Sequence, residues 1–282
     1  MQNKLTIKEL FSKTYNLVKY NLVLVQPLLI FFLLMGFILN PAGRVRFNLT
    51  GIVLLLSVGG LFCAFIAGWF NMFHKSVELQ SNPDLPPEER AVRSVGLFKE
   101  FFPGVGKFLP KIAYGLIIYG FLVFLSFLLI HFTGIILVKY FGYSGGSKFS
   151  DLLSLIIADK KTSGLDTIAI NQWNVISLVL SYFTMFWIQA IISANRHPVY
   201  AYFESFRAAI KAPLTTIIIF LSSWFSMMLI SGFIAITYSN IFAQFLGLML
   251  MILTLVYFIM MAFVYFEQYS NIHSGSDSIG QD

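Results

Sequence analysis

Charged side chains are scarce in this sequence. Lys, Arg, Asp and Glu make up 11% of its 282 residues, whereas a soluble domain usually contains about 25%. Hydrophobic residues reach 57%, and the mean hydropathy is +0.78. This composition excludes a soluble globular fold and indicates an integral membrane protein.

Cysteine is nearly absent as well. Cys63 is the only one and lies inside an apolar run, which excludes an intramolecular disulfide and a multi-cysteine metal site. Three histidines, His74, His197 and His273, follow apolar runs, and three imidazoles can ligate zinc. Because no carboxylate or cysteine is patterned with them, and histidine suits a membrane interface, we expect no metal and no cofactor.

Signatures of catalysis and of ion coupling are also missing. The sequence has no glycine-rich phosphate loop, no His-Glu-x-x-His and no Gly-x-Ser-x-Gly. Ion-coupled transporters normally keep ionisable groups inside the membrane, yet no Asp, Glu, Lys or Arg lies well inside the long apolar runs. Isolated polar residues there suit hydrogen bonds between helices better than substrate binding: Gln26, Asn71, His131, Gln189 and Gln244. We therefore expect no enzyme.

Long apolar runs, by contrast, fill most of the chain. A membrane helix needs about 20 mostly apolar residues, and six windows have that length: 21–39, 49–73, 109–132, 175–194, 213–238 and 241–266. They are apolar on every side, whereas barrel strands alternate in hydrophobicity. The sequence predicts an all-α fold, a polytopic bundle with six transmembrane helices in a single membrane domain. Residues 134–173 are expected to form an extracytoplasmic loop, and 268–282 a flexible cytoplasmic tail.

The basic residues are distributed unequally between the two sides. Thirteen Lys and Arg residues fall before helix 1 or between helices 2 and 3 or 4 and 5, against six in the other loops. By the positive-inside rule, both termini are cytoplasmic. Basic residues beside membrane helices attract anionic lipids, so the net charge of +6 implies no nucleic-acid partner.

Short amphipathic segments precede the odd-numbered runs, at residues 6–19, 94–107 and 199–211. Each has a Phe eight or nine residues before a terminal Lys, and these pairs are expected at the membrane surface: Phe11 and Lys19, Phe98 and Lys107, Phe203 and Lys211. Thr6 and Glu9 form a capping box that starts the first segment, while Pro103, Gly104 and Gly106 predict a short or kinked second one. The pattern suggests interfacial helices and a threefold repeat, at 1–80, 90–197 and 198–273.

A stripe of small residues runs along the second expected helix. Gly60, Ala64 and Gly68 recur at every fourth position. Membrane helices associate largely through van der Waals contact, which small residues permit at close range. We expect this stripe to pack against another helix, either within the chain or in a second copy.

Some short motifs resemble those of a known group. Thr6-Ile-Lys-Glu-Leu-Phe11 through Leu17-Val-Lys19, Tyr202-Phe-Glu-Ser-Phe206 and Tyr265-Phe-Glu267 resemble motifs of bacterial six-helix inner-membrane proteins of unknown function. That group includes the membrane domain attached to some glycerophosphodiester phosphodiesterases. The resemblance implies a bacterial inner-membrane location. The soluble phosphodiesterase domain is absent from the sequence, and no catalytic residue transfers.

Two hypotheses follow for function. The first is a non-enzymatic integral membrane protein that acts through helix packing, contact with membrane lipids or a protein partner in the envelope, including a second copy of itself. The alternative is a permease-like or lipid-handling transporter subunit that works with a separate ATPase, which would contact the segments around Phe98 and Phe203.

Overall fold

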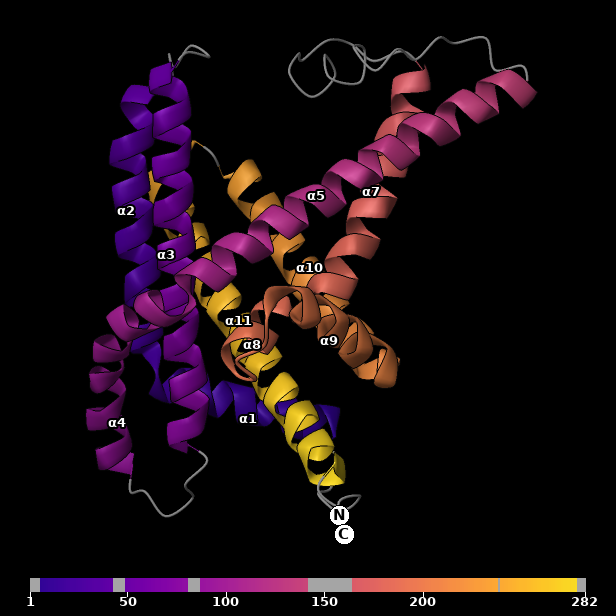
Figure 1. The fold of residues 1–282 in the computed structure, drawn as a ribbon. Helices are drawn as coiled ribbons and strands as arrows, with labels where there is room; N and C mark the ends of the chain where they lie inside the picture. The colour runs from indigo at the N-terminus through magenta and orange to yellow at the C-terminus, as the bar shows by residue number, and fades with distance from the viewer. Residues whose placement is uncertain (1–5, 43–48, 81–86, 142–163, 238, 278–282) are drawn as a thin grey trace. The chain divides into compact units, whose positions relative to one another are not determined.

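A computed structural model describes residues 6–42, 49–80, 87–141, 164–237 and 239–277. These residues are all-helical, without strands (Figure 1). In chain order the elements are α1 (Ile7–Tyr20), the 3₁₀ turn η1 (Leu22–Leu24), α2 (Val25–Ala42), α3 (Leu49–Gln80), α4 (Pro87–Gly96), the 3₁₀ turn η2 (Leu97–Glu100), α5 (Phe101–Phe141), α7 (Gly164–Thr184), α8 (Trp187–Ile192), α9 (Pro198–Lys211), α10 (Pro213–Ile236) and α11 (Ile241–Asp277).

Five stretches of the described helices are long and apolar enough to cross a membrane. They are Gly51–Leu79, Val92–Leu129, Val175–Ile192, Pro213–Ile236 and Ile241–Ser270. A sixth is reached if Ile7–Tyr20 and Leu22–Ile38, which meet at 77°, are one bent span. A multi-pass helical architecture is therefore confirmed, with five or six candidate spans.

Several helices extend beyond their expected ends. α5 continues to Phe141 and α7 begins at Gly164, so helix occupies both ends of the stretch 134–173 that was expected to be a loop; residues 142–163 lie outside the described part. α11 runs through Asp277, well into the expected tail 268–282. α4 begins at Pro87, because proline suits the first position of a helix.

The chain divides into two compact units. One contains Met1–Ala113 and Met185–Asp282, and the other contains Tyr114–Thr184. In the second unit, the later part of α5 packs against α7, where the rings of Phe127 and Trp173 stack with centroids 4.3 Å apart. The first unit contains the short helices α1, α8 and α9.

In the first unit, α1 begins and ends at polar residues. The Thr6 side chain accepts from the Glu9 backbone N–H, and the Glu9 carboxylate accepts from the Thr6 N–H at 2.7 Å, as a capping box requires. The chain then turns at Asn21, whose Nδ2 donates to the Leu17 carbonyl at 2.8 Å. Trp69 of α3 donates its indole N–H to the Leu24 carbonyl at 2.7 Å, which joins α3 to the turn between α1 and α2.

A close crossing joins α3 to the start of α5. A Cβ on Gly68 would lie 2.8 Å from the Phe101 carbonyl oxygen, and one on Gly104 would lie 2.5 Å from the Cβ of Asn71. Asn71 Nδ2 also donates to the Glu100 carbonyl at 2.8 Å. The segment 94–107, expected to form a short or kinked helix, is divided by η2 between α4 and α5. α5 then runs through Pro103 and Gly104 without a break, because the first turn of a helix has no intrahelical partner for the N–H that proline lacks.

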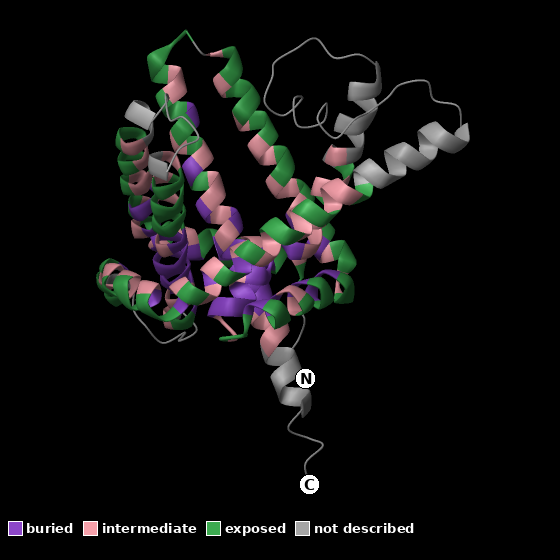
Figure 2. Ribbon diagram, turned by 45° about the horizontal axis from the view of Figure 1, so that its top comes forward, coloured by how far each residue is buried: buried purple, intermediate pink, exposed green. Residues whose placement is uncertain are grey.

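The buried side chains of this unit lie where its short helices meet α3 and α11. Purple segments gather there in Figure 2, and the largest buried side chains include Phe73, Phe108, Phe186, Phe263 and Phe266. Many large apolar side chains elsewhere are exposed. On α10 only Thr216 and Ile219 are buried, so this span presents most of its length to its surroundings.

Candidate functional site

The short helix α9 packs on the protein through small residues. Its buried positions are Pro198, Ala201, Ser205, Ala208 and Ala209. The Ser205 hydroxyl accepts from the Phe186 N–H at 3.0 Å, and the Tyr265 hydroxyl of α11 donates to the Ala208 carbonyl at 3.2 Å. Small side chains let the α9 backbone approach its neighbours closely. The side of α9 that faces the protein is thus its least bulky side.

The bulky apolar residues of α9 point away from the protein. Phe203 is 67% exposed, Phe206 47% and Ile210 52%. α1 is the opposite case, because Leu10 and Leu17 on its apolar side are each only 2% exposed. Of these two 14-residue helices, α1 buries its large apolar side chains and α9 exposes them.

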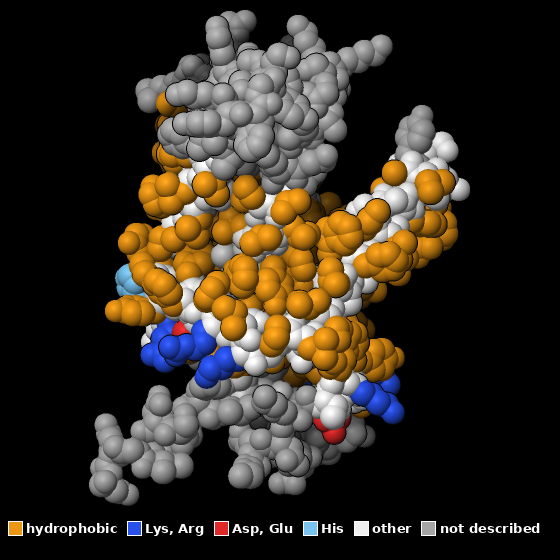
Figure 3. Space-filling model, turned by 90° about the vertical axis from the view of Figure 1, so that its right-hand side faces the viewer, with side chains coloured by type: hydrophobic (Ala, Val, Ile, Leu, Met, Phe, Trp, Pro, Cys, Tyr) orange, Lys and Arg blue, Asp and Glu red, His pale blue; other side chains and the backbone are white. Residues whose placement is uncertain are grey.

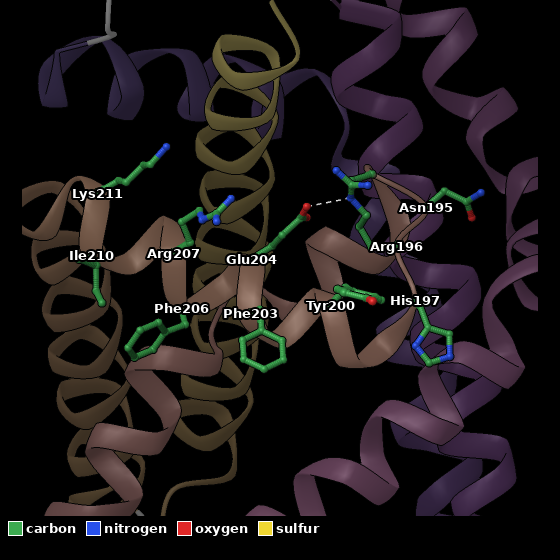
Figure 4. Close-up of a pocket in the computed structure, with 11 residues that line it drawn as sticks. Asn195, Arg196, His197, Tyr200, Phe203, Glu204, Phe206, Arg207, Ile210 and Lys211 are labelled. Atoms are coloured by element: carbon green, nitrogen blue, oxygen red, sulfur yellow. Dashed lines mark ion pairs between the residues drawn. The ribbon is translucent and has the colours of Figure 1, made fainter. Parts of the chain in front are cut away.

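An open groove of about 840 Å³ runs along the outer side of α9. Figure 4 shows how its lining divides: Glu204, Arg207 and Lys211 extend to one side of the helix, and Phe203, Phe206 and Ile210 to the other. We call this surface the α9 groove. It has a charged margin and an apolar margin, the arrangement of a helix that lies at a membrane interface.

Four charged side chains line the α9 groove. Arg196 Nε lies 2.8 Å from the Glu204 carboxylate (Figure 4). Arg207 and Lys211 are exposed, and the Lys211 ammonium lies 5.7 Å from the centroid of the Tyr269 ring. The charges of Arg196 and Glu204 cancel, so the net charge of the four side chains is positive. This positive charge lies on Arg207 and Lys211, at the end of the groove nearest α10.

The turn that leads into α9 is fixed by the start of α5. Asn195 has a φ of 50°, a left-handed conformation that asparagine tolerates better than most residues. The Lys111 ammonium donates to the Asn195 carbonyl at 3.1 Å and to its side-chain oxygen at 2.8 Å. Pro198 then occupies the first position of α9, where its missing N–H has no consequence. The N-terminal end of the groove is therefore anchored.

A second groove, almost wholly apolar, lies between α2, α3 and the start of α5. Its volume is about 430 Å³, and its lining includes Phe31, Ala64, Phe65, Phe98 and Phe101. Phe98 is therefore only half exposed and faces apolar neighbours. Of the three paired phenylalanines, Phe203 is the one whose ring is mainly exposed.

The remaining expected surface residues have varied surroundings. Phe11 is half-buried, and its carbonyl accepts from the Tyr257 hydroxyl at 3.3 Å. Lys19 and Lys107 are exposed, with their ammonium groups 6.0 Å and 4.9 Å from the ring centroids of Tyr20 and Phe108.

The small-residue stripe on α3 divides along its length. Gly68 touches Phe101, Ala64 lines the apolar groove, and a Cβ on Gly60 would meet nothing within 4 Å. Only the Gly68 end of the stripe packs closely within the described part of this chain.

Two polar residues of the expected spans, Asn71 and Gln189, are buried. Asn71 bonds across the α3 crossing, and His74 Nδ1 lies 2.8 Å from the Glu267 carboxylate on α11. Gln189 is buried, and its Oε1 has no hydrogen-bond partner in the described structure. Among the residues whose placement is described, no three His, Cys, Asp or Glu side chains could hold a metal ion. The side chain of His273 lies outside that part.

Phe203 and Lys211 were expected from the sequence, whereas Arg207 was not singled out. A pattern of small residues in the sequence could have predicted which side of α9 packs on the protein. Ala201, Ser205 and Ala208 recur at helical spacing on the side opposite Phe203. Small residues at such positions mark a packing face in membrane proteins. Comparison of the chain with protein families, with curated proteins and with solved structures finds no match.

Proposed function

We propose that this chain is a non-enzymatic integral protein of the bacterial inner membrane that acts through contact with membrane lipids along α9. The observation that carries the proposal is the exposure of Phe203, Phe206 and Ile210 on a helix whose opposite side is packed. An exposed apolar row beside basic residues is the pattern of a helix that lies in the headgroup region.

The position of α9 along the chain supports the same function. α10 begins at Pro213, two residues after Lys211, and is apolar and largely exposed over its 24 residues. A span of that length starts at one edge of the hydrocarbon layer, so the end of α9 lies at the adjacent headgroup level. Figure 3 shows hydrophobic side chains over most of the described part of one face, with few Lys and Arg side chains among them. By the positive-inside rule, the distribution of basic residues along the chain supports a cytoplasmic location for α9.

Photocrosslinking from the lipid tests the proposal. The full-length protein would be reconstituted with a phospholipid that has a diazirine at the end of an acyl chain, irradiated and mapped by peptide mass spectrometry. We expect adducts on Phe203, Phe206 or Ile210. The matched control is the apolar side of α1, where Leu10 and Leu17 are packed and should remain unlabelled. Labelling of α1 without labelling of α9 would overturn the proposal, as would saturable transport of a defined solute.

The second candidate is a transporter subunit driven by a separate ATPase. The exposure of Phe203 on a short helix between spans favours it, because a motor protein could contact such a side chain. The half-buried position of Phe98 in an apolar groove makes a matching contact there less accessible. An ATPase that co-purifies with the chain, and that is lost on Phe203→Ala, would favour this candidate over the first.

A further inference from the structure

We propose that the α9 groove binds one anionic phospholipid, with its phosphate between Arg207 and Lys211 and an acyl chain along Phe206 and Ile210. This inference rests on the lipid contact proposed above and names the class of lipid. A phospholipid site of this kind requires a localised positive charge, an adjoining apolar surface and a position at the membrane boundary.

The localised charge comes from two residues one helical turn apart. Arg207 and Lys211 are four residues apart on α9, so they lie on the same side of the helix and repel each other. The nearest acidic side chain on α9, Glu204, already pairs with Arg196 at 2.8 Å. A bound anion would relieve the repulsion between the two cations. Arginine can donate two parallel hydrogen bonds to a phosphate, and lysine adds a mobile point charge.

The adjoining apolar surface makes the occupant an amphiphile. Phe206 and Ile210 form the apolar margin of the α9 groove, and Arg207 and Lys211 lie on its charged margin, so one molecule in the groove would meet cations at one end and apolar side chains at the other (Figure 4). A free phosphate ion would leave Phe206 and Ile210 uncovered. A soluble phosphopeptide would have to enter the headgroup layer. A phospholipid can contact both the charged and the apolar margin of the groove, and phospholipids are already present at the headgroup level of the membrane.

The groove is also open and of suitable size. About 840 Å³ falls in the range of pockets that hold drug-sized ligands, roughly 300–1,000 Å³, and a headgroup with the first part of its chains is of that order. The Lys211 ammonium lies over the Tyr269 ring at 5.7 Å, which restrains the lysine near the start of α10.

Lipid selectivity measured by electron paramagnetic resonance tests the inference. The intact protein would be reconstituted in phosphatidylcholine vesicles that contain trace spin-labelled phosphatidylglycerol or spin-labelled phosphatidylcholine. The immobilised fraction gives the relative association of the two lipids. We expect a preference for phosphatidylglycerol, and a loss of about ten-fold for each cation removed, since a hydrogen bond between charged groups contributes about a factor of ten or more. Arg207→Gln with Lys211→Gln should therefore abolish the preference.

Matched variants distinguish a lipid bound in the α9 groove from the general attraction of anionic lipids to basic residues at the membrane surface. Lys13→Gln with Lys19→Gln removes the same charge from exposed positions on α1 and should keep the preference, as should the exchange Arg207→Lys with Lys211→Arg. An equal loss in the α1 variant, or no loss in the α9 variant, would overturn the inference. Displacement of the labelled lipid by excess inorganic phosphate would assign a small-anion site instead. If acyl-chain crosslinks to α9 persist in either case, the lipid contact stands and only the selectivity fails.

Discussion

Tyr265 of α11 and Ala208 of α9 are joined by a hydrogen bond of 3.2 Å from the tyrosine hydroxyl to the alanine carbonyl. Tyr265 also stacks on Phe186, with ring centroids 5.1 Å apart, and the Phe186 N–H donates to the Ser205 hydroxyl of α9. These contacts attach α9 to the core by its small-residue side and leave its bulky side outward.

Loss of the Tyr265 hydroxyl should loosen this attachment. Tyr265→Phe leaves the stacked ring in place and removes one buried hydrogen bond, so we expect a loss of about 0.5–1.5 kcal/mol, measured by thermal unfolding in detergent micelles. Tyr15→Phe, on the exposed side of α1, is the matched control and should have no effect. Equal stability of all three proteins would mean that the hydroxyl does not hold α9.

Two glycines on α3 should respond in opposite directions to alanine. Gly68→Ala would place a methyl group 2.8 Å from the Phe101 carbonyl oxygen, and the helices must move apart, at a cost of about 1–3 kcal/mol. Gly60→Ala meets nothing within 4 Å and should be neutral or gain up to about 1 kcal/mol in helix propensity. Unfolding midpoints of the two variants check this contrast, and a destabilising Gly60→Ala would reveal a partner outside the described chain.

The His74 and Glu267 pair should couple α3 to α11. The two side chains are 22% and 19% exposed and 2.8 Å apart, so a double-mutant cycle with His74→Ala and Glu267→Ala should give a coupling of about 0.5–3 kcal/mol. The exposed pair Lys75 and Glu78 is the control and should give about 0–1 kcal/mol. Additive effects of the His74 and Glu267 substitutions would show that the contact contributes nothing to stability.

The start of α1 should weaken in acid. The Thr6 backbone N–H and hydroxyl donate to the Glu9 carboxylate at 2.7 and 2.9 Å, and this lowers the pKa of Glu9 below its ordinary value of 4.5. The stabilisation is therefore complete above that value and is lost as the pH falls through the lowered pKa. Hydrogen-exchange protection of the first turn should decline in that window. Glu9→Gln should remove the pH dependence of this protection. An unchanged decline in the Glu9→Gln variant would show that the Glu9 carboxylate is not its cause.

Hydropathy was sufficient to predict most spans and the all-helical fold, since a long apolar run has few alternatives. The capping box likewise predicted the start of α1. The path of α5 was harder, because Pro103 and Gly104 suggest a break; Gly104 is instead explained by the approach of Asn71 from a distant part of the chain. Such a tertiary contact has no local signal in the sequence.

The direction in which α9 faces also depends on its neighbours. Leu10, Thr14 and Leu17 are buried in α1, and Ala201, Ser205 and Ala208 are buried at the same spacing in α9. Matching these buried positions pairs Phe11 with Tyr202, one residue away from the expected match with Phe203. The threefold repeat stays a prediction, and the lipid-facing role of Phe203 does not depend on it.

The depth of residue 203 in the bilayer tests the central claim most directly. Cys63 is the only cysteine, so Cys63→Ala gives a background in which Phe203→Cys and Arg207→Cys can each be spin-labelled in reconstituted protein. We expect the label at 203 to collide with oxygen, which concentrates in hydrocarbon, and to be shielded from a water-soluble nickel chelate, while the label at 207 shows higher nickel accessibility. Equal and high nickel accessibility at both positions would contradict a lipid-facing Phe203.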